Sequence, residues 1–260
     1  MMEQIRIVKI GGNVINDPTL LRKFLKDFAQ IEGKKILVHG GGKLATDLAL
    51  KLNVPQQLID GRRVTDEETL KIVTMVYAGY INKNIVAQLQ ANKCAALGIS
   101  GADGEIIKAH KRIAAIDYGF VGDVDEVDIE KLSVLLHTFG TIVIAPITKD
   151  AGGQLLNTNA DTIAQEIAKA LSHTYDTKLI YTFEKTGVLL DVNNEASLIH
   201  RLDKSYYKAL KKEEKIFAGM IPKLDNAFQA LKSGVATVCI GEAKELKGLI
   251  AGSCGTKIVL

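Results

Sequence analysis

Short runs of β-forming residues alternate with amphipathic stretches along the 260-residue chain, and this alternation constrains the fold more than any other feature. Several runs stop at glycines: residues 5–10 stop at Gly11 and Gly12, and residues 35–39 stop at residues 40–42. The pattern is typical of strand–helix–strand units, which build a mostly parallel sheet with helices on both faces. The sequence therefore predicts an α/β protein, a three-layer sandwich around a central sheet.

The apolar patterns also place the individual elements. Strands are predicted at residues 5–10, 35–39, 94–99, 141–145, 178–182, 236–240 and 257–260, with hairpin-like pieces over 106–127 and a polar turn over 148–153. Helices are predicted from residue 18 and over 44–51, 65–92, 160–171, 204–213, 223–233 and 243–251. A capping box of Thr65 with Glu68 would open the longest helix. Because no flexible linker interrupts the chain, any two halves should share one continuous sheet.

The longest helical pattern carries an unusually wide apolar face. Its apolar residues include Leu70, Val73, Val76, Tyr77, Tyr80, Ile81, Ile85 and Leu89. Such a face can pack on the core and on a partner subunit together, so we expect a homodimer formed through the helix 66–92. The alternative, one buried helix in a monomer, is left open by the sequence.

Composition and charge exclude several classes of protein. The chain has 33 Lys and Arg against 30 Asp and Glu, and a net charge of +3 gives no electrostatic footprint for nucleic acid. No apolar run reaches the ~18 residues of a membrane span, and the first residues lack the apolar core of a secretory signal. The 3 Cys form no CxxC pair. We expect a cytoplasmic protein that binds neither nucleic acid nor membranes.

Three glycine clusters follow predicted strands, at residues 11–12, 40–42 and 101–104. In an open α/β sheet, ligands bind beyond the carboxyl ends of the strands, where glycines let backbone N–H groups approach phosphate or carboxylate oxygens. Neither GxxxxGK(S/T) nor GxGxxG is present, and His39 stands where a dinucleotide fold would place an acidic residue. These absences argue against a P-loop enzyme and a dehydrogenase.

Two lysines and one aspartate lie where a charged site would need them. Lys9 stands among apolar residues beside the first glycines, and a buried ammonium needs a counter-charge. Lys223 begins a helix, where the helix dipole disfavours a cation unless an anion binds nearby. Asp161 follows Asn159 at the start of another helix and could hold both lysines. Two cations and one organising carboxylate suit phosphoryl transfer.

These residues resemble, in order, those of the acetylglutamate kinases of the amino acid kinase family. The matching segments are IVKIGGNVI (7–15), LVHGGG (37–42), DGRRVTD (60–66), GISGADG (98–104), GFVGDVDEVD (119–128), LLNTNADTIA (155–164), GMIPK (219–223) and GTKI (255–258). The segments span nearly the whole chain. The resemblance implies that the γ-phosphoryl group of ATP is transferred to the γ-carboxylate of an N-acylated glutamate in arginine biosynthesis.

The resemblance also implies roles for individual residues. The catalytic residues would be Lys9 and Lys223, which stabilise the transition state, and Asp161, which orients both lysines. Substrate would be bound by Gly41, Gly42, Arg63 and Asn157, with Arg63 on the α-carboxylate, and Gly11 and Gly12 would lie beside the transferring phosphoryl group. ATP contacts are expected at Thr182, Gly187, Phe217 and Gly219. Mg²⁺ would be bound by the phosphates of the nucleotide and by water, so no metal ligands are expected from the protein.

Residues 1–150 are expected to form an N-terminal lobe for acyl-glutamate binding and dimerisation, and residues 151–260 a C-terminal lobe for ATP binding. The first strand begins by Ile5, which leaves no room for the N-terminal helix of arginine-inhibited hexameric members, so a homodimer without arginine feedback is expected. Phe183 or Glu184 replaces an aspartate that the family usually carries near ATP, and the region 113–118 could alter the acyl pocket.

Three alternatives remain open after the resemblance. The acceptor could carry a bulkier acyl group, as in N-succinylglutamate. The chain could be another kinase of the same fold, acting on carbamate, aspartate or UMP. It could also be a non-catalytic sensor that binds nucleotide or amino acid through the same glycines.

Overall fold

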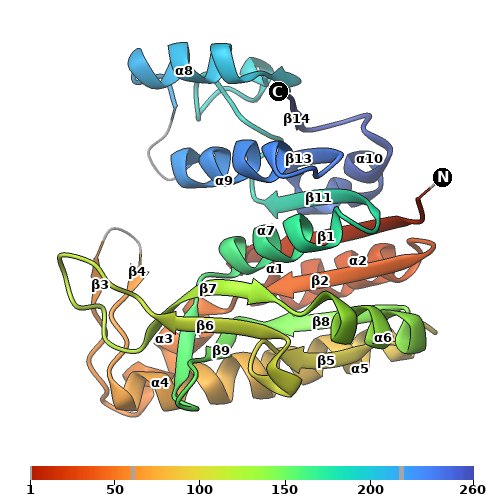
Figure 1. Cartoon of the computed structure of the whole chain (residues 1–260). Coiled ribbons are helices and arrows are strands. Elements are labelled where there is room, and N and C mark those ends of the chain that lie inside the picture. Colours follow the sequence, from red (N-terminus) through yellow and green to blue (C-terminus); the bar gives the residue numbers. More distant parts are fainter. Residues whose placement is uncertain (1, 60–61, 217–219) are drawn as a thin grey trace.

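The computed structural model describes residues 2–59, 62–216 and 220–260 and contains one large sheet between two layers of helices (Figure 1). The eight strands of this sheet lie in the order β12-β14-β13-β11-β1-β2-β8-β5. Their bounds are β1 Gln4–Ile10, β2 Lys34–His39, β5 Leu97–Ser100, β8 Thr141–Ala145, β11 Asp176–Phe183, β12 Arg201–Leu202, β13 Thr237–Glu242 and β14 Thr256–Ile258. Only the pair β13–β14 is antiparallel. The predicted three-layer α/β fold is confirmed.

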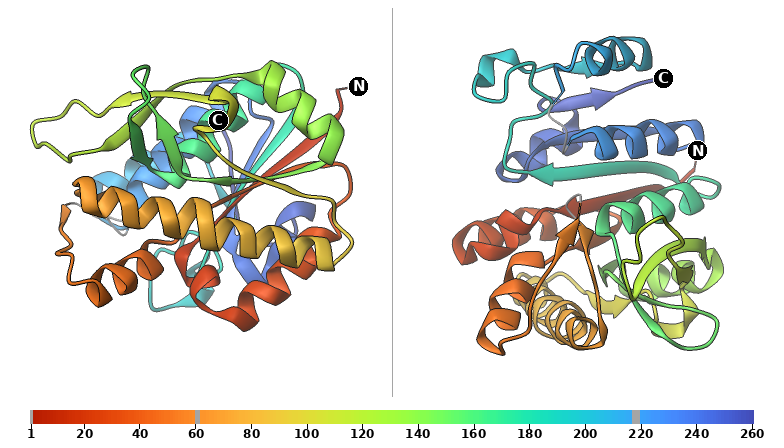
Figure 2. Two further views of the ribbon diagram at one scale, coloured as in Figure 1. Left: turned by 90° about the horizontal axis from the view of Figure 1, so that it is seen from below. Right: turned by 90° about the vertical axis from the view of Figure 1, so that its left-hand side faces the viewer.

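Helices cover both faces of the sheet, so that each face has its own apolar core (Figure 2). Along β1 the side chains alternate, and Ile7 packs in one core while Val8 packs in the other. One layer contains α6 Ile129–Phe139, α7 Ala160–Leu171, α8 Lys204–Lys212 and α9 Ile221–Lys232. The other contains α1 Gly12–Asn16, α2 Pro18–Ala29, α3 Gly42–Lys51, α4 Glu67–Thr74, the π-helix η1 Met75–Ile81, α5 Asn82–Ala91 and α10 Leu246–Ala251.

A small closed barrel and a short hairpin complete the structure. The barrel consists of β6 Ile107–Lys111, β7 Val121–Val127, β9 Ile147–Lys149 and β10 Leu155–Thr158. The hairpin consists of β3 Leu58–Ile59 and β4 Arg62–Arg63. Among the described residues, 3₁₀ turns include η2 Asp103–Glu105, η3 Glu195–Ser197 and η5 Ala243–Glu245. Strands β6 and β7 form the hairpin that was predicted over 106–127. The polar stretch 148–153 is only in part a turn, because it connects the paired strands β9 and β10.

The longest helix starts differently from the prediction. It begins at Glu67, and the side chain of Asp66 caps it by accepting the Thr69 N–H at 2.8 Å. Thr65 lies before the helix and donates to the Arg63 carbonyl at 3.1 Å, so the predicted capping box is wrong. Helices α4, η1 and α5 form one continuous rod (Figure 2, left). Its central turn is a π-helix, which a 3.6-residue pattern does not predict.

Other elements also differ from the prediction, among them one helix and the start of one strand. Helix α6 is absent from the predicted set, although Asp128 caps it by accepting the Lys131 N–H at 3.0 Å. Strand β5 begins at Leu97, three residues later than the run that starts at Cys94.

Among the described residues, no helix combines the length and apolarity that crossing a membrane requires.

Candidate active site

Two lysines from opposite ends of the chain meet one carboxylate at the end of the central sheet. Lys9 Nζ lies 2.8 Å from Asp161 Oδ1, and Lys223 Nζ lies 3.2 Å from Asp161 Oδ2. Lys9 stands near the carboxyl end of β1, Asp161 in the first turn of α7 and Lys223 in the first turn of α9. The structure therefore brings together the three residues that were predicted as catalytic.

The start of α7 holds the carboxylate in place. Asn159 caps this helix, and its side chain accepts the N–H groups of Asp161 at 2.8 Å and Thr162 at 3.0 Å. Burial alone would raise the pKa of Asp161, but the ammonium groups of Lys9 and Lys223 outweigh burial and bring the pKa below its usual value. The carboxylate of Asp161 is therefore ionised at neutral pH and attracts both side chains.

The first of two cavities beside this cluster has a volume of about 200 Å³ and is lined by residues 40–42. The Cβ of any other residue at position 41 would lie 2.2 Å from Ile81 Cδ1, and Gly41 has a φ of +150°, so only glycine fits there. Gly41 caps α3, which has no side-chain cap. Among the described residues, the N–H groups of Gly41 and Gly42 have no acceptor. These amides are therefore available to an anion.

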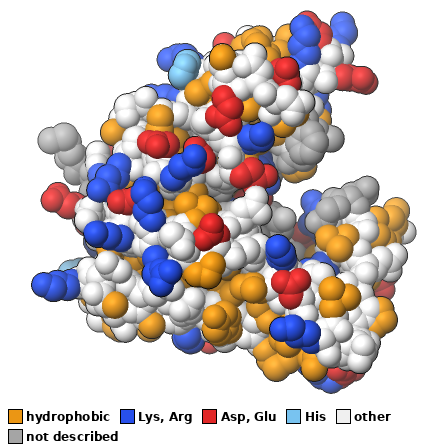
Figure 3. Space-filling model, turned by 180° about the vertical axis from the view of Figure 1, so that it is seen from behind, with side chains coloured by type: hydrophobic (Ala, Val, Ile, Leu, Met, Phe, Trp, Pro, Cys, Tyr) orange, Lys and Arg blue, Asp and Glu red, His pale blue; other side chains and the backbone are white. Residues whose placement is uncertain are grey.

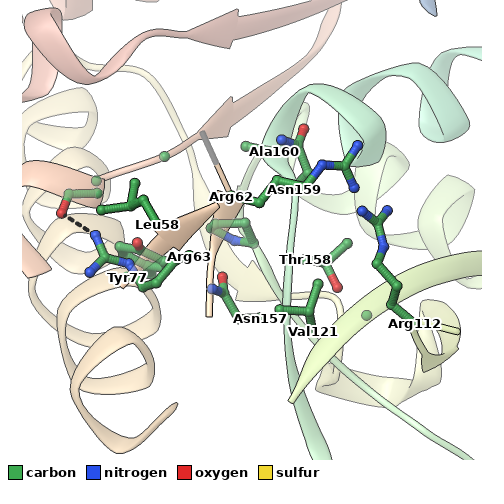
Figure 4. Close-up of a pocket in the computed structure, with 15 residues that line it drawn as sticks. Leu58, Arg62, Arg63, Tyr77, Arg112, Val121, Asn157, Thr158, Asn159 and Ala160 are labelled. Carbon is green, nitrogen blue, oxygen red and sulfur yellow. Dashed lines mark hydrogen bonds between the residues drawn. The ribbon is translucent and has the colours of Figure 1, made fainter. Parts of the chain in front are cut away.

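Arg63 lines the same cavity, and hydrogen bonds to neighbouring residues hold its guanidinium in place. Its guanidinium donates to the Gly42 carbonyl at 2.8 Å (Figure 4). It also donates to Thr46 Oγ1 at 2.9 Å and to the Gln56 side chain. These bonds hold the guanidinium at the wall of the cavity. Gln56 and Thr46 were not predicted, because they lie 7 and 17 residues from Arg63 in the sequence and carry no motif.

Asn157 also lines the first cavity and is linked to the same network. Its amide donates to Thr65 Oγ1 at 3.0 Å, and Thr65 in turn donates to the Arg63 carbonyl. The two residues predicted to bind substrate thus belong to one hydrogen-bonded unit, although they come from a hairpin and from the small barrel.

Two further arginines line this cavity and were not predicted as site residues. Arg62 precedes Arg63 on β4, and Arg112 follows β6 (Figure 4). Arg112 Nε donates to both carboxylate oxygens of Asp123, at 3.1 and 3.0 Å. Nothing in the local sequence distinguishes Arg112 from a surface arginine, since only closure of the barrel brings it to the cavity. It stands directly before the region 113–118 that was expected to shape the acyl pocket.

The second cavity has a volume of about 380 Å³ and reaches the lysines of the charged cluster. Both lysines line it, whereas Ala160, the residue before Asp161, lines the first cavity. Gly11 and Gly12 also line the second cavity. In the space-filling view from behind, a notch separates the part that carries α8 and α9 from the part that carries β3 and β4 (Figure 3).

Of the four residues expected to contact ATP, the structure describes two. Thr182 and Gly187 line the second cavity, but the Thr182 hydroxyl donates to the Lys9 carbonyl at 3.1 Å and so supports β1. A Cβ at Gly187 would lie 2.5 Å from Leu198 Cδ1, so this turn packs closely on its neighbours. Phe217 and Gly219 lie outside the described residues.

The two residues that depart from the family pattern also line the second cavity. These are Phe183 and Glu184, and the Glu184 carboxylate accepts a hydrogen bond from the Asn13 side chain. Within the described part of the chain, no group of three or more His, Cys, Asp or Glu is arranged to hold a metal ion.

The sequence model of the amino acid kinase family matches residues 4–242. The chain belongs to the amino acid kinase family. Acetylglutamate kinase of Cytophaga hutchinsonii is 50% identical over 262 residues, which cover 99% of this chain and 99% of that protein. Acetylglutamate kinase of Campylobacter curvus is 38% identical and is matched over 83% of its length by 91% of this chain.

Several solved structures have the same architecture. The protein smu.665 from Streptococcus mutans superposes with a TM-score of 0.77 at 25% identity, over 98% of both chains. The N-acetylglutamate synthase of Neisseria gonorrhoeae superposes with a TM-score of 0.83 at 21% identity, over 100% of this chain and 60% of that one. Giardia carbamate kinase gives a TM-score of 0.72 at 14% identity, over 99% of each chain. The latter two likenesses concern the fold alone.

Proposed function

We propose that this member of the amino acid kinase family is an acetylglutamate kinase. It transfers the γ-phosphoryl group of ATP to the γ-carboxylate of N-acetyl-L-glutamate, a step of arginine biosynthesis, and the products are an acyl phosphate and ADP. The curated relatives at about 50% identity over nearly the whole chain support this function. The structural observation that carries it is the pair of ammonium groups held by Asp161 between two cavities.

The chemistry explains why such a pair is needed. A carboxylate oxygen forms a bond to the γ-phosphorus while the bond from that phosphorus to the β–γ bridging oxygen breaks, so two anions approach each other. Lys9 and Lys223 offset this repulsion, and each well-placed donor contributes about 2.7–4 kcal/mol to the transition state. Asp161 holds the two ammonium groups apart and in place. Most of the catalysis is therefore positioning and charge stabilisation.

The two cavities divide the substrates between them. The first cavity would take the acylated glutamate, with its α-carboxylate on Arg63, its acyl amide near Asn157 and its γ-carboxylate on the N–H groups of Gly41 and Gly42. The second would take ATP as its Mg²⁺ complex, with the γ-phosphoryl group beside Gly11 and Gly12. Supporting this division, residues 40–42 line one cavity and both lysines line the other.

Three further properties belong to the same proposal. Residues 1–150 supply most of the acceptor site and residues 151–260 most of the nucleotide site. The chain acts in the cytoplasm. Two copies associate through the helix 66–92, where Met75 and Tyr80 are 53% and 66% exposed.

A coupled assay of ADP release tests the proposed function. With N-acetylglutamate as acceptor we expect turnover well above the rate of ATP hydrolysis alone, whereas carbamate, aspartate and UMP should give only the background rate. ADP release with one of these three acceptors and not with N-acetylglutamate would assign the chain to another kinase of the family. No ADP release with any acceptor, despite measurable ATP binding, would indicate a sensor.

One observation favours a second acceptor, N-succinylglutamate. N-acetylglutamate has only one carboxylate besides the reacting one, yet Arg62 and Arg112 line the cavity in addition to Arg63. A succinyl group would bring a further carboxylate to these guanidinium groups. The same assay decides between the two acceptors by their kcat/KM values, and Arg112→Gln should lower kcat/KM for the succinyl compound more than for the acetyl compound.

A further inference from the structure

A buried imidazole lies beneath the loop between β2 and α3. His39 ends β2 and has no exposed surface, and its Nδ1 lies 2.8 Å from the Gly40 carbonyl oxygen. On the other side of the ring, Asn82 Nδ2 lies 3.3 Å from Nε2. A carbonyl oxygen only accepts hydrogen bonds, so Nδ1 carries the proton and Nε2 accepts from the Asn82 amide. The two contacts together fix the tautomer and the orientation of the ring.

Asn82 is itself anchored at the ends of two neighbouring strands. Its amide nitrogen, whose two hydrogens are shared among three acceptors, also lies 3.2 Å from the Ile99 carbonyl on β5 and 3.1 Å from the Val143 carbonyl on β8. Its side-chain oxygen accepts from Lys83 Nζ at 3.1 Å. Asn82 is completely buried and follows the π-helix that packs on Gly41. The imidazole is therefore held by a rigid part of the sheet and not by the loop that it supports.

The contact to Gly40 determines which way the next amide points. A trans peptide is planar, so the Gly40 carbonyl and the Gly41 N–H point in opposite directions. Because His39 holds the Gly40 carbonyl, the Gly41 N–H points away from the buried imidazole, and Gly41 also lines the first cavity. Two consecutive glycines resist rotation of this peptide plane less than any other residues. The loop alone therefore does not fix the direction of the N–H.

We propose that His39 and Asn82 form a positioning pair, which holds the Gly40–Gly41 peptide so that the Gly41 N–H faces the acceptor. This inference rests on the proposed function, which assigns the first cavity to the acylated glutamate. His39 itself touches no substrate and is a positioning residue. Without the imidazole, the peptide adopts both orientations, and in one of them a carbonyl oxygen faces the anionic acceptor.

Variants of His39 with different hydrogen-bonding reach test this proposal. His39→Leu removes both contacts and should lower kcat/KM for N-acetylglutamate about 10- to 100-fold. This is less than the roughly 10²- to 10³-fold fall in kcat that follows when a hydrogen-bond donor to the transition state is removed completely. The KM for ATP should stay unchanged, because ATP binds in the other cavity. His39→Asn keeps a donor close to the position of Nδ1 and should recover most of the loss. His137→Leu, in the exposed part of α6, is the matched control.

The outcomes separate the positioning pair from a merely structural role. If His39→Leu equals the wild type, or if the KM for ATP rises in parallel with the loss on the acceptor, the proposal is wrong. If His39→Leu does not fold, His39→Asn is compared with His39→Gln, whose longer side chain reaches the Nε2 position but not the Gly40 carbonyl. We expect the Asn variant to be at least about tenfold more active than the Gln variant, and equal activities would overturn the proposal.

A second measurement keeps this inference separate from the proposed function. If the wild type releases no ADP with N-acetylglutamate, the proposed function fails, whatever the His39 variants do. The amide ¹H–¹⁵N NMR signal of Gly41 then reports the peptide plane directly. In His39→Leu, or in His39→Gln if the Leu variant does not fold, the contact to Gly40 is lost, and we expect exchange broadening or a doubled signal. The wild type and His137→Leu should each give a single sharp signal. An unchanged Gly41 signal would contradict the positioning pair.

Discussion

At the scale of single residues, the site depends on charges that would be unstable apart. Lys9 and Asp161 each have only 13% of their side-chain surface exposed, and a buried ion without a partner is costly. Each therefore requires the other, and Lys223 adds a second ammonium group from the helix that starts beside them. The same arrangement leaves two positive charges facing one carboxylate, a net positive centre that suits a polyphosphate.

Replacing either lysine should therefore stop catalysis and spare the fold. Lys9→Ala and Lys223→Ala are each expected to lower kcat at least ~10²-fold, because each removes one donor from the transition state. Steady-state kinetics measure the loss, and circular dichroism checks the fold. Lys108→Ala, which removes an exposed lysine paired with Glu126, should keep normal turnover. Near-normal kcat in both site variants would remove the two lysines from the catalytic role.

His39 should make stability depend on pH in a narrow range. Burial lowers the pKa of this imidazole to about 4, against 6.5 in the unfolded chain, so the unfolded state takes up a proton first as the pH falls. The contribution is present above about pH 6.5 and is lost progressively between pH 6.5 and 4. Between pH 7.5 and 5 we expect a loss of about 2 kcal/mol in the free energy of unfolding.

Urea unfolding at the two pH values measures this loss. The His39→Asn variant carries no titrating group at position 39, so the difference between wild type and variant isolates the contribution of the imidazole from that of the carboxylates. The same pH dependence in both proteins would show that the histidine is not responsible.

At the scale of elements, the turn from β2 into α3 tolerates a side chain at one glycine and not at the next. A Cβ at Gly40 meets nothing within 4 Å, whereas a Cβ at Gly41 meets Ile81 and the ring of Tyr77, at a φ of +150°. Gly41→Ala should therefore lower the free energy of unfolding by about 1–3 kcal/mol. Gly40→Ala should change it by about 0.5 kcal/mol or less. Denaturant unfolding of the pair tests this, and equal costs would contradict the strained turn.

The start of α4 offers a similar comparison between the predicted and the observed cap. Asp66→Ala removes the side chain that accepts the Thr69 N–H and should cost about 1 kcal/mol of stability. Glu68→Ala removes only a surface ion pair with Lys71 and should cost about 0.5 kcal/mol or less. Thermal unfolding of both variants shows which substitution lowers the stability more. A larger loss for Glu68 than for Asp66 would restore the capping box.

The elements that the sequence predicts well are those whose signals are local. Helix α7 matches the predicted residues 160–171, because a cap at Asn159 and an amphipathic pattern lie within one stretch. Helix α6, which was not predicted, carries the same kind of signal, because Asp128 is followed by apolar residues at helical spacing. The π-helix and the small barrel have no local signal, since packing and pairing between distant segments produce them.

In the candidate site, too, some features could be predicted from the sequence and others could not. The meeting of Lys9, Lys223 and Asp161 was predictable from unusual residue types at the ends of strands and helices, read together with a family resemblance. The hydrogen bonds from Arg63 to Gln56 and from Asn82 to His39 were not predictable, because polar residues without a motif acquire their partners only when the chain folds.

At the scale of the whole molecule, the rod formed by α4, η1 and α5 tests the expected dimer. Light scattering should give twice the mass of one chain at micromolar concentration, because the exposed Tyr80 would be covered by a partner. Tyr80→Glu should give a monomer. Ile113→Glu changes the 90% exposed Ile113, which belongs to the loop between β6 and β7 and not to the rod, and should remain a dimer. A hexamer, or a monomeric wild type, would contradict the expected assembly.

The position of β1 at the middle of the sheet has a consequence for how the protein is made. Strand β1 leaves the ribosome before the other strands of the sheet, and β2 can pair with one edge of β1 soon afterwards. The other edge waits for β11, which starts only at residue 176. For most of translation, the nascent chain therefore carries the backbone around Lys9 with one unpaired edge, the kind of edge that invites aggregation and chaperone binding.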